Sequence, residues 1–290
     1  MNIQNVSFGY KNGFVLQDVS FTLPNPSIFG LIGPNGAGKT TLFSILSGIL
    51  KPSSGTFVYS EKPGLLLQNN ALYKEATGRE NLQLFCKINR ISPNQVSTAL
   101  EVVEIDSLTA NRKYKEYSQG QKQRLLIARA FLTPSKLILL DEPFNAVDLP
   151  TMLILKNSIK SIVATEQKTV VISSHHLREI DDLIDSGIIL NKGRVIHQFG
   201  LLNNVAQPLA ITVYVDGQPD RLCSYLLANK YLFRKQQNQI SITCSATSPA
   251  WPIIRFCEET GIALKRIEYG ESLENMLINR LNADNEHASN

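Results

Sequence analysis

The sequence is poor in the features that mark secreted, metal-binding or membrane-spanning proteins. It has four cysteines among 290 residues, with no Cys-x-x-Cys pair, and its four histidines show no metal-binding spacing. Such spacing favours reduced thiols over disulfides or a zinc site. No apolar run approaches the roughly 20 residues of a membrane helix, and Met1 leads into no signal peptide. We therefore expect a soluble, cytoplasmic protein.

An excess of charge of one sign is also missing. Lysine and arginine number 29 against 25 aspartates and glutamates, which gives a net charge of +4 without a long basic run. A weakly basic surface is compatible with a membrane face or with nucleic acid, but ordinary solvation explains it. We therefore predict no nucleic-acid partner. Hydrophobic residues make up 43% of the chain, which is enough to bury a sizeable core.

Strand and helix patterns alternate over roughly the first 200 residues. A buried strand over 27–33 runs through a glycine-rich loop into a helix over 39–46. Two further buried strands, over 136–143 and 168–175, flank a helix over 151–165. Alternation of this kind predicts an α/β domain with a largely parallel sheet.

Other segments of this domain break the alternation. Residues 3–23 alternate apolar and polar side chains and predict a β-hairpin or a β-meander. From about 78 to 118 the apolar residues recur only with helical spacing. A helix over 177–184 and a hairpin over 186–200 complete the domain, to which we assign residues 1–205.

The pattern changes after Gly200. Residues 211–270 follow the order strand, helix, strand, strand, helix, strand, which is the ferredoxin-like α+β plan. We therefore expect a C-terminal accessory domain over residues 206–290, with a tail that is disordered from about Asp284.

The glycine-rich loop "GLIGPNGAGKTT" carries the first chemical signal. Gly33, four further residues and then Gly38, Lys39 and Thr40 match the P-loop, in the required place between a strand and a helix. Backbone N–H groups of such a loop wrap phosphates, Lys39 reaches the β- and γ-phosphates, and the Thr40 hydroxyl binds Mg²⁺. A glycine-rich turn without a ligand is the alternative. The predicted nucleotide-binding residues of the loop are Gly33, Pro34, Asn35, Gly36, Ala37, Gly38, Lys39, Thr40 and Thr41.

The stretch "LILLDEP" supplies the second half of a nucleotide site. Its apolar residues bury a strand and present Asp141 at the carboxyl end, where it can hold Mg²⁺ through water. Glu142 follows directly and can accept a proton from the attacking water as general base, although a solvated carboxylate is the alternative. The sequence therefore predicts that the site takes ATP and Mg²⁺.

Further short motifs follow in a fixed order, and the complete set resembles one family. "GPNGAGKTT", "LLLQNN", "YSQGQ", "LILLDE", "NAVD" and "ISSHH" are similar to the Walker A, Q-loop, signature, Walker B, D-loop and switch motifs of ATP-binding cassette (ABC) transporter nucleotide-binding subunits. The resemblance covers roughly residues 1–200. Besides the two halves already named, it selects Tyr10, Gln68, Ser118, Gly120, Gln121, Asp148 and His175.

The resemblance implies roles for these residues. Gln68 is expected to touch Mg²⁺ and to line the contact with a membrane subunit, and Tyr10 to stack on adenine. His175 is expected to act with Glu142 in hydrolysis. Ser118 and Gly120 are expected to complete the γ-phosphate site of a second cassette, because the N-terminus of their helix favours an anion.

The resemblance also implies an architecture and an assembly. It predicts a P-loop ABC ATPase core with an antiparallel β subdomain and a helical subdomain over about 78–118. Two chains are expected to form a head-to-tail dimer with two composite sites. A separate integral membrane subunit would then place the chain on the cytoplasmic face of the membrane. The C-terminal domain resembles, more weakly, the extra domain of exporter-type cassettes.

The chain departs from the family pattern at several positions. The signature has Tyr117 in place of leucine and Gln119 in place of glycine, and the D-loop begins with Asn145 in place of serine. The neighbouring His176 competes with His175 as the switch histidine. Phe8 and Phe14 compete with Tyr10 for the adenine, and packing in the core is a further alternative for this aromatic residue.

Two other function classes compete with a transport ATPase. Family members that act on ribosomes usually carry two cassettes, and those that act on chromosomes carry long coiled coils, whereas this chain has one cassette and no sustained heptads. A regulatory module that holds ATP without turnover predicts a missing Glu142 or a broken signature. We therefore expect an exporter subunit that binds and hydrolyses ATP.

Overall fold

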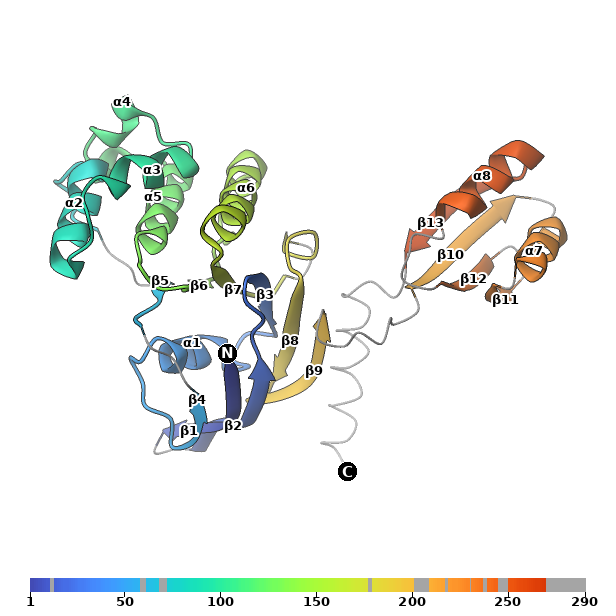
Figure 1. Cartoon of the computed structure of the whole chain (residues 1–290), viewed down its shortest axis with the longest axis horizontal. Coiled ribbons are helices and arrows are strands. Elements are labelled where there is room, and N and C mark those ends of the chain that lie inside the picture. Colours follow the sequence, from blue (N-terminus) through green and yellow to red (C-terminus); the bar gives the residue numbers. More distant parts are fainter. Residues whose placement is uncertain are drawn as a thin grey trace. The chain divides into compact units, whose positions relative to one another are not determined.

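The computed structural model describes residues 1–10, 13–57, 61–67, 72–176, 179–200, 209–216, 219–229, 231–236, 239–244 and 250–269. The chain divides into two compact units, Met1–Leu202 and Asn203–Asn290. The first unit contains two sheets and the second contains one, and each unit has its own hydrophobic core; Figure 1 follows the elements of both along the chain.

The first unit is built on a six-stranded sheet with the order β5-β6-β7-β3-β8-β9. All neighbours pair in parallel except β9, which is antiparallel to β8. Every residue of β3, β6, β7 and β8 is buried, as expected for parallel strands covered on both faces. The predicted parallel sheet and the hairpin after it are confirmed. The strands are β3 (Ser27–Ile32), β5 (Gly64–Leu66), β6 (Leu137–Asp141), β7 (Thr169–Ser174), β8 (Ser186–Asn191) and β9 (Arg194–Gly200).

A smaller antiparallel sheet packs beside it. Its order is β2-β1-β4, with β1 (Asn2–Tyr10), β2 (Gly13–Thr22) and β4 (Ser54–Phe57). Apolar side chains of β1 and β2 share one core with β3 and with α1 (Lys39–Leu46), the helix that follows the glycine-rich loop. The hairpin alternative for residues 3–23 and the predicted helix over 39–46 are therefore confirmed.

Helices account for the regular structure between residues 78 and 131, and they gather on one side of the first unit in Figure 1. α2 starts with a reciprocal capping box, in which Thr77 accepts from the Glu80 backbone N–H and the Glu80 carboxylate accepts from the Thr77 N–H. The predicted helical character of this segment is confirmed. The elements are α2 (Gly78–Asn89), α3 (Gln95–Val102), α4 (Ser107–Ala110), the 3₁₀ turn η1 (Tyr114–Glu116) and α5 (Gln119–Phe131).

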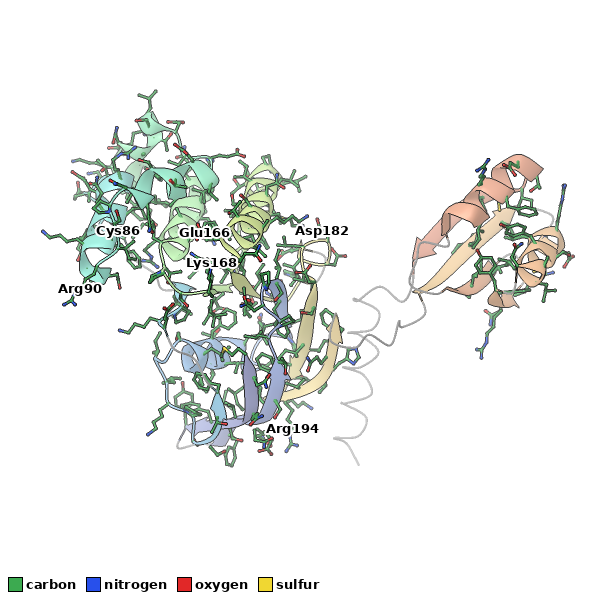
Figure 2. All side chains as sticks on the ribbon, viewed as in Figure 1. Cys86, Arg90, Glu166, Lys168, Asp182 and Arg194 are labelled. Atoms are coloured by element: carbon green, nitrogen blue, oxygen red, sulfur yellow. The ribbon has the colours of Figure 1, made fainter. Side chains whose placement is uncertain are left out.

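The predicted helix over 177–184 is wrong for the residues that the structure describes there. After α6 (Leu149–Glu166) and β7, residues 179–184 form turns, with the Leu183 N–H on the Ile180 carbonyl oxygen at 3.0 Å. Tertiary contacts hold this segment in place. Lys156 of α6 donates to Asp182 at 2.6 Å, and the Ile28 N–H donates to Asp185 at 2.8 Å. Figure 2 labels Asp182 at this turn.

The second unit follows the predicted strand and helix order. Its four-stranded antiparallel sheet has the order β11-β12-β10-β13, and α7 and α8 share a buried core with it. The predicted disorder from about Asp284 lies outside the described residues. The elements are β10 (Leu209–Asp216), α7 (Pro219–Ala228), β11 (Leu232–Gln236), β12 (Gln239–Cys244), α8 (Ala250–Thr260) and β13 (Ala263–Tyr269).

Within the described part of the chain, no helix is both long and apolar enough to cross a membrane.

Candidate nucleotide-binding site

The loop over residues 33–38 joins the carboxyl end of β3 to α1, and two of its glycines are required by space and backbone conformation. A Cβ at Gly33 would stand 2.2 Å from the Leu190 carbonyl oxygen. Gly38 has a φ of +105°, and a Cβ there would stand 2.7 Å from Leu16 Cδ2. The loop is therefore packed against β2 and β8, with the N-terminus of α1 at its end, which is the geometry of an anion cradle.

Lys39 is buried at the start of α1 and its ammonium group lies inside the loop. Nζ donates to the carbonyl oxygens of Gly33 at 2.8 Å and Pro34 at 3.2 Å. The same ammonium lies 3.5 Å from Glu142 Oε1, and both side chains are buried. The positive charge is thus fixed between the predicted phosphate loop and the predicted general base.

Asp141 lies at the end of β6 and accepts two hydroxyl hydrogen bonds. Thr40 Oγ1 donates to Oδ2 at 3.0 Å, and Ser173 Oγ donates to Oδ1 at 2.5 Å. Ser173 also accepts from the Glu142 N–H at 2.9 Å. A hydroxyl and a carboxylate side by side are hard oxygen ligands of the kind Mg²⁺ prefers, so these residues fit the predicted ion.

The sequence did not reveal Ser173. It stands directly opposite Asp141 in the parallel pairing of β6 and β7. The signal available was a pair of serines, Ser173 and Ser174, after the apolar residues of the strand, and which of them faces Asp141 depends on the strand register.

Glu142 has a left-handed backbone conformation, with φ of 51°. Its carboxylate is buried between the side chains of Lys39 and His175. Oε2 lies 2.5 Å from His175 Nδ1, while Oε1 faces Lys39. The imidazole that contacts Glu142 is that of His175. The adjacent His176 packs on it, with ring centroids 3.8 Å apart. A buried carboxylate held in this way can accept a proton from water at a fixed position.

A cavity of ≈ 330 Å³ opens over these groups. It brings the loop residues together with Glu142 and with Val15 of β2. Tyr10 and Phe14 both have exposed side chains, 59% and 69%, and neither belongs to this lining. The lining is Val15, Asn35, Gly36, Gly38, Lys39, Thr40, Thr41 and Glu142.

Ser118 and Gln121 form the capping box of α5 rather than part of this cavity. Ser118 Oγ accepts from the Gln121 N–H at 3.2 Å, and Gln121 Oε1 accepts from the Ser118 N–H at 3.0 Å. Among the described residues that line the cavity, none comes from 118–121. Gln68, the predicted Q-loop residue, lies outside the described residues.

One further contact joins the signature helix to the region after Glu142, and a second hydrogen bond lies within that region. Gln123 Nε2 donates to the Pro143 carbonyl oxygen at 2.7 Å, a contact that the sequence did not suggest. Asp148 is the N-cap of α6, and its Oδ1 accepts from the Thr151 N–H at 3.1 Å. Hydrogen bonds from the Thr151 hydroxyl and N–H hold the pKa of Asp148 below its usual value.

A larger cavity, of ≈ 550 Å³, lies at the opposite ends of β6 and β7, between α3 and α6. Its buried cation is already bound by the protein. Lys168 Nζ donates to the carbonyl oxygens of Phe131 and Thr133 and pairs with Glu166 at 2.7 Å, where Figure 2 labels both partners of the ion pair. The chemistry therefore favours the smaller cavity over the larger one. The P-loop follows β3, and the acidic pair Asp141 and Glu142 lies at the end of β6, which is separated from β3 in the sheet by β7 alone. This arrangement defines a P-loop nucleoside triphosphatase.

Comparison with known proteins narrows this class. A family model described as ABC transporter matches residues 16–145. The uncharacterized ABC transporter ATP-binding protein YdbJ of Bacillus subtilis is 33% identical over 241 residues, which cover 79% of this chain and 78% of that protein. The lantibiotic transport ATP-binding protein SrtF of Streptococcus pyogenes is 31% identical over 205 residues, covering 68% and 89%.

Solved structures that resemble this chain are also ABC transporter cassettes. The dimeric structure of the bacterial ABC transporter cassette MJ0796 superimposes with a TM-score of 0.62 at 25% identity, covering 69% of this chain and 98% of that one. A post-hydrolysis dimer of the same cassette, bound to ADP and Pi, gives 0.61 at 25% identity, with 69% and 98% covered. The chain belongs to the family of ABC transporter ATP-binding proteins. It is an ATP-binding subunit and an ATPase.

Proposed function

We propose that this chain hydrolyses ATP to energise export through a separate integral membrane subunit, on the cytoplasmic face of the membrane. The observation that carries the proposal is the buried Glu142, held between Lys39 at 3.5 Å and His175 at 2.5 Å. Export is supported by relatives such as the Nod factor export ATP-binding protein I of Rhizobium johnstonii, 32% identical over 212 residues. The sulfate/thiosulfate import ATP-binding protein CysA of Mesostigma viride is 31% identical over 208 residues.

The P-loop holds the triphosphate. The amides of the loop, including those of Asn35, Gly36 and Ala37, surround the phosphates, and Lys39 pairs with the β- and γ-phosphate oxygens. When Lys39 binds the phosphates, its ammonium group exchanges the carbonyl oxygens of Gly33 and Pro34 for phosphate oxygens. Tyr10 stacks on the adenine, for which its exposed ring at the end of β1 is available.

Thr40 and Asp141 would hold Mg²⁺, with Gln68 as a further ligand and as a contact to the membrane subunit. Held by these residues, the ion would supply positive charge to the β- and γ-phosphates. The 3.0 Å hydrogen bond between Thr40 and Asp141 shows that their oxygens already converge. Ser173 keeps the Asp141 carboxylate in that orientation.

Glu142 accepts the proton of the attacking water, and His175 fixes the direction of its carboxylate. Ser118, Gly120, Gln121 and Asp148 face a second cassette in a head-to-tail dimer with two composite sites. Residues 1–205 form the ATP-binding domain, with its helical subdomain over about 78–118, and residues 206–290 form the accessory domain.

Replacing Glu142→Gln tests the function directly. The amide cannot take the proton, so ATP hydrolysis should fall by about a hundredfold or more, while ATP still binds. Phosphate release and ATP titration calorimetry measure the two effects on the full chain. Glu101→Gln, on the exposed face of α3, is the matched control and should hydrolyse ATP like the wild type. Hydrolysis at the wild-type rate by the Glu142 variant would remove this residue from the mechanism. A wild-type chain without turnover would indicate a binding module.

A further inference from the structure

The second residue of α5 is a glycine, although glycine is among the least favourable residues in a helix. The backbone at Gly120 is not in the left-handed region, so its conformation does not require glycine. Something in the surroundings of Gly120 must therefore exclude a side chain.

The neighbouring group is the side chain of Thr151, the third residue of α6. A Cβ on Gly120 would stand 2.5 Å from Thr151 Oγ1 and 3.4 Å from Thr151 Cβ and Cγ2. Thr151 is buried. The hydroxyl of Thr151 thus occupies the space that any side chain at position 120 would need.

Thr151 is at the same time bound to the cap of its own helix. Its N–H donates to Asp148 Oδ1 at 3.1 Å. Thr151 therefore contacts both the signature segment, with its side chain at Gly120, and the D-loop segment, with its backbone N–H at Asp148.

A second contact holds α5 to the same stretch of chain. Gln123, one turn after Gly120, donates to the Pro143 carbonyl oxygen at 2.7 Å. The start of α5 is consequently fixed at two points to the segment that begins with Glu142 and ends in the first turn of α6.

We propose that Thr151 is a positioning residue that locks residues 118–121 to residues 145–148 within one chain. The inference rests on the proposed head-to-tail assembly, in which both segments face the second cassette. Because they are joined through Thr151, they approach the partner's nucleotide as one rigid piece. Glycine is required at position 120 to make room for this joint.

A double-mutant cycle tests the joint without nucleotide, using thermal unfolding of the full chain. Gly120→Ala should lower the unfolding temperature in the wild-type background, because its Cβ meets the Thr151 hydroxyl. In the Thr151→Ala background the same substitution should raise it by about 2 to 4 °C, because alanine then favours the helix without a clash. The control is Thr165→Ala, an exposed threonine on the same helix, which should leave the effect of Gly120→Ala unchanged.

The sign of the effect decides the outcome. If Gly120→Ala destabilises the chain equally in both backgrounds, the two residues do not interact and the inference is overturned.

Steady-state ATP hydrolysis tests the positioning role. Thr151→Ala should lower kcat about fivefold, which corresponds to about 1 kcal/mol, because the side chain that packs against Gly120 is lost, with KM for ATP unchanged because the P-loop is untouched. Thr151→Ser keeps the hydroxyl and should restore the wild-type kcat. An unchanged kcat in Thr151→Ala overturns the positioning role. A wild-type chain without ATPase activity instead overturns the proposed function, and the unfolding cycle still reports whether the joint exists.

Discussion

At the scale of single residues, the site joins its charged groups into one network. Lys39 contacts two carbonyl oxygens of its own loop and the carboxylate of Glu142, and Glu142 in turn contacts His175. A γ-phosphate that pairs with Lys39 competes with Glu142 for the ammonium group. In the proposed mechanism, nucleotide binding and the release of Glu142, the proposed general base, are therefore linked through one ion pair.

Lys39→Ala should weaken ATP binding by about tenfold or more, because it removes the cation that pairs with the β- and γ-phosphates. Calorimetric titration of the full chain with ATP measures the change. Lys51→Ala removes an exposed lysine soon after α1 and serves as the matched control. Unchanged affinity in Lys39→Ala would show that the nucleotide binds elsewhere.

At the scale of elements, the departure at Tyr117 has a structural reason. The side chain is 3% exposed, and its hydroxyl donates to the Thr109 carbonyl oxygen at 2.7 Å, which ties the start of α5 to α4. A Cβ at Gly78, the first residue of α2, would stand 2.1 Å from this hydroxyl. The larger tyrosine is thus accommodated by a glycine on the neighbouring helix.

Burial raises the pKa of Tyr117 from 10.0 to about 12. Between pH 10 and 12 the unfolded chain loses this proton and the folded chain keeps it, so stability is fully present below pH 10 and falls across this window. The loss is on the order of 2 to 3 kcal/mol. Urea unfolding at pH 9 and pH 11.5 should show a larger decline for the wild type than for Tyr117→Phe. Equal declines would mean that Tyr117 ionises alike in both states.

Elements set by local patterns could be predicted from the sequence. Continuous apolar runs gave β3, β6 and β7, and the glycine-rich loop gave the start of α1. The helix expected over 177–184 is wrong for the described residues 179–184, because contacts from α6 and β3 hold this segment and the adjacent Asp185 in a turn conformation. Periodicity reports which face of a segment is apolar, and it does not report which distant partners compete for the segment.

The candidate site likewise contains residues that local motifs predict and residues that only the tertiary structure reveals. Lys39, Thr40, Asp141 and Glu142 follow from motifs, since each motif fixes its own local geometry. The partners Ser173 and Gln123 depend on strand register and helix packing, which a single sequence does not specify. The second role of Gly120, as room for Thr151, depends on the contact between two helices.

At the scale of the whole molecule, the two units have separate cores. Among the described residues, the buried core of the second unit is formed by side chains from within 213–262. A chain truncated after residue 205 should therefore fold and bind ATP with the affinity of the full chain. Calorimetry measures binding, and circular dichroism confirms that the truncated chain is folded. A folded truncated chain that does not bind ATP would place part of the nucleotide site in the second unit.

In the proposed dimer, each composite site combines the P-loop of one chain with the signature segment of the other, and this can be tested by mixing two variants. Ser118→Asp keeps an N-cap for α5 but places a carboxylate where the partner's γ-phosphate is expected. This variant should bind ATP normally as an isolated chain, because Lys39 and the loop are untouched, and it should fail to hydrolyse it. Mixed with Lys39→Ala chains, it should form dimers in which one composite site carries both lesions and the other carries none.

About half of the dimers in an equal mixture are of this mixed kind, each with one intact site of two. Activity should therefore return to about a quarter of the wild-type rate if one intact site turns over alone. Each variant at the same total concentration is the control, and phosphate release is the measurement. If Ser118→Asp abolishes ATP binding by the isolated chain, the signature segment serves the nucleotide of its own chain, and the head-to-tail arrangement is wrong.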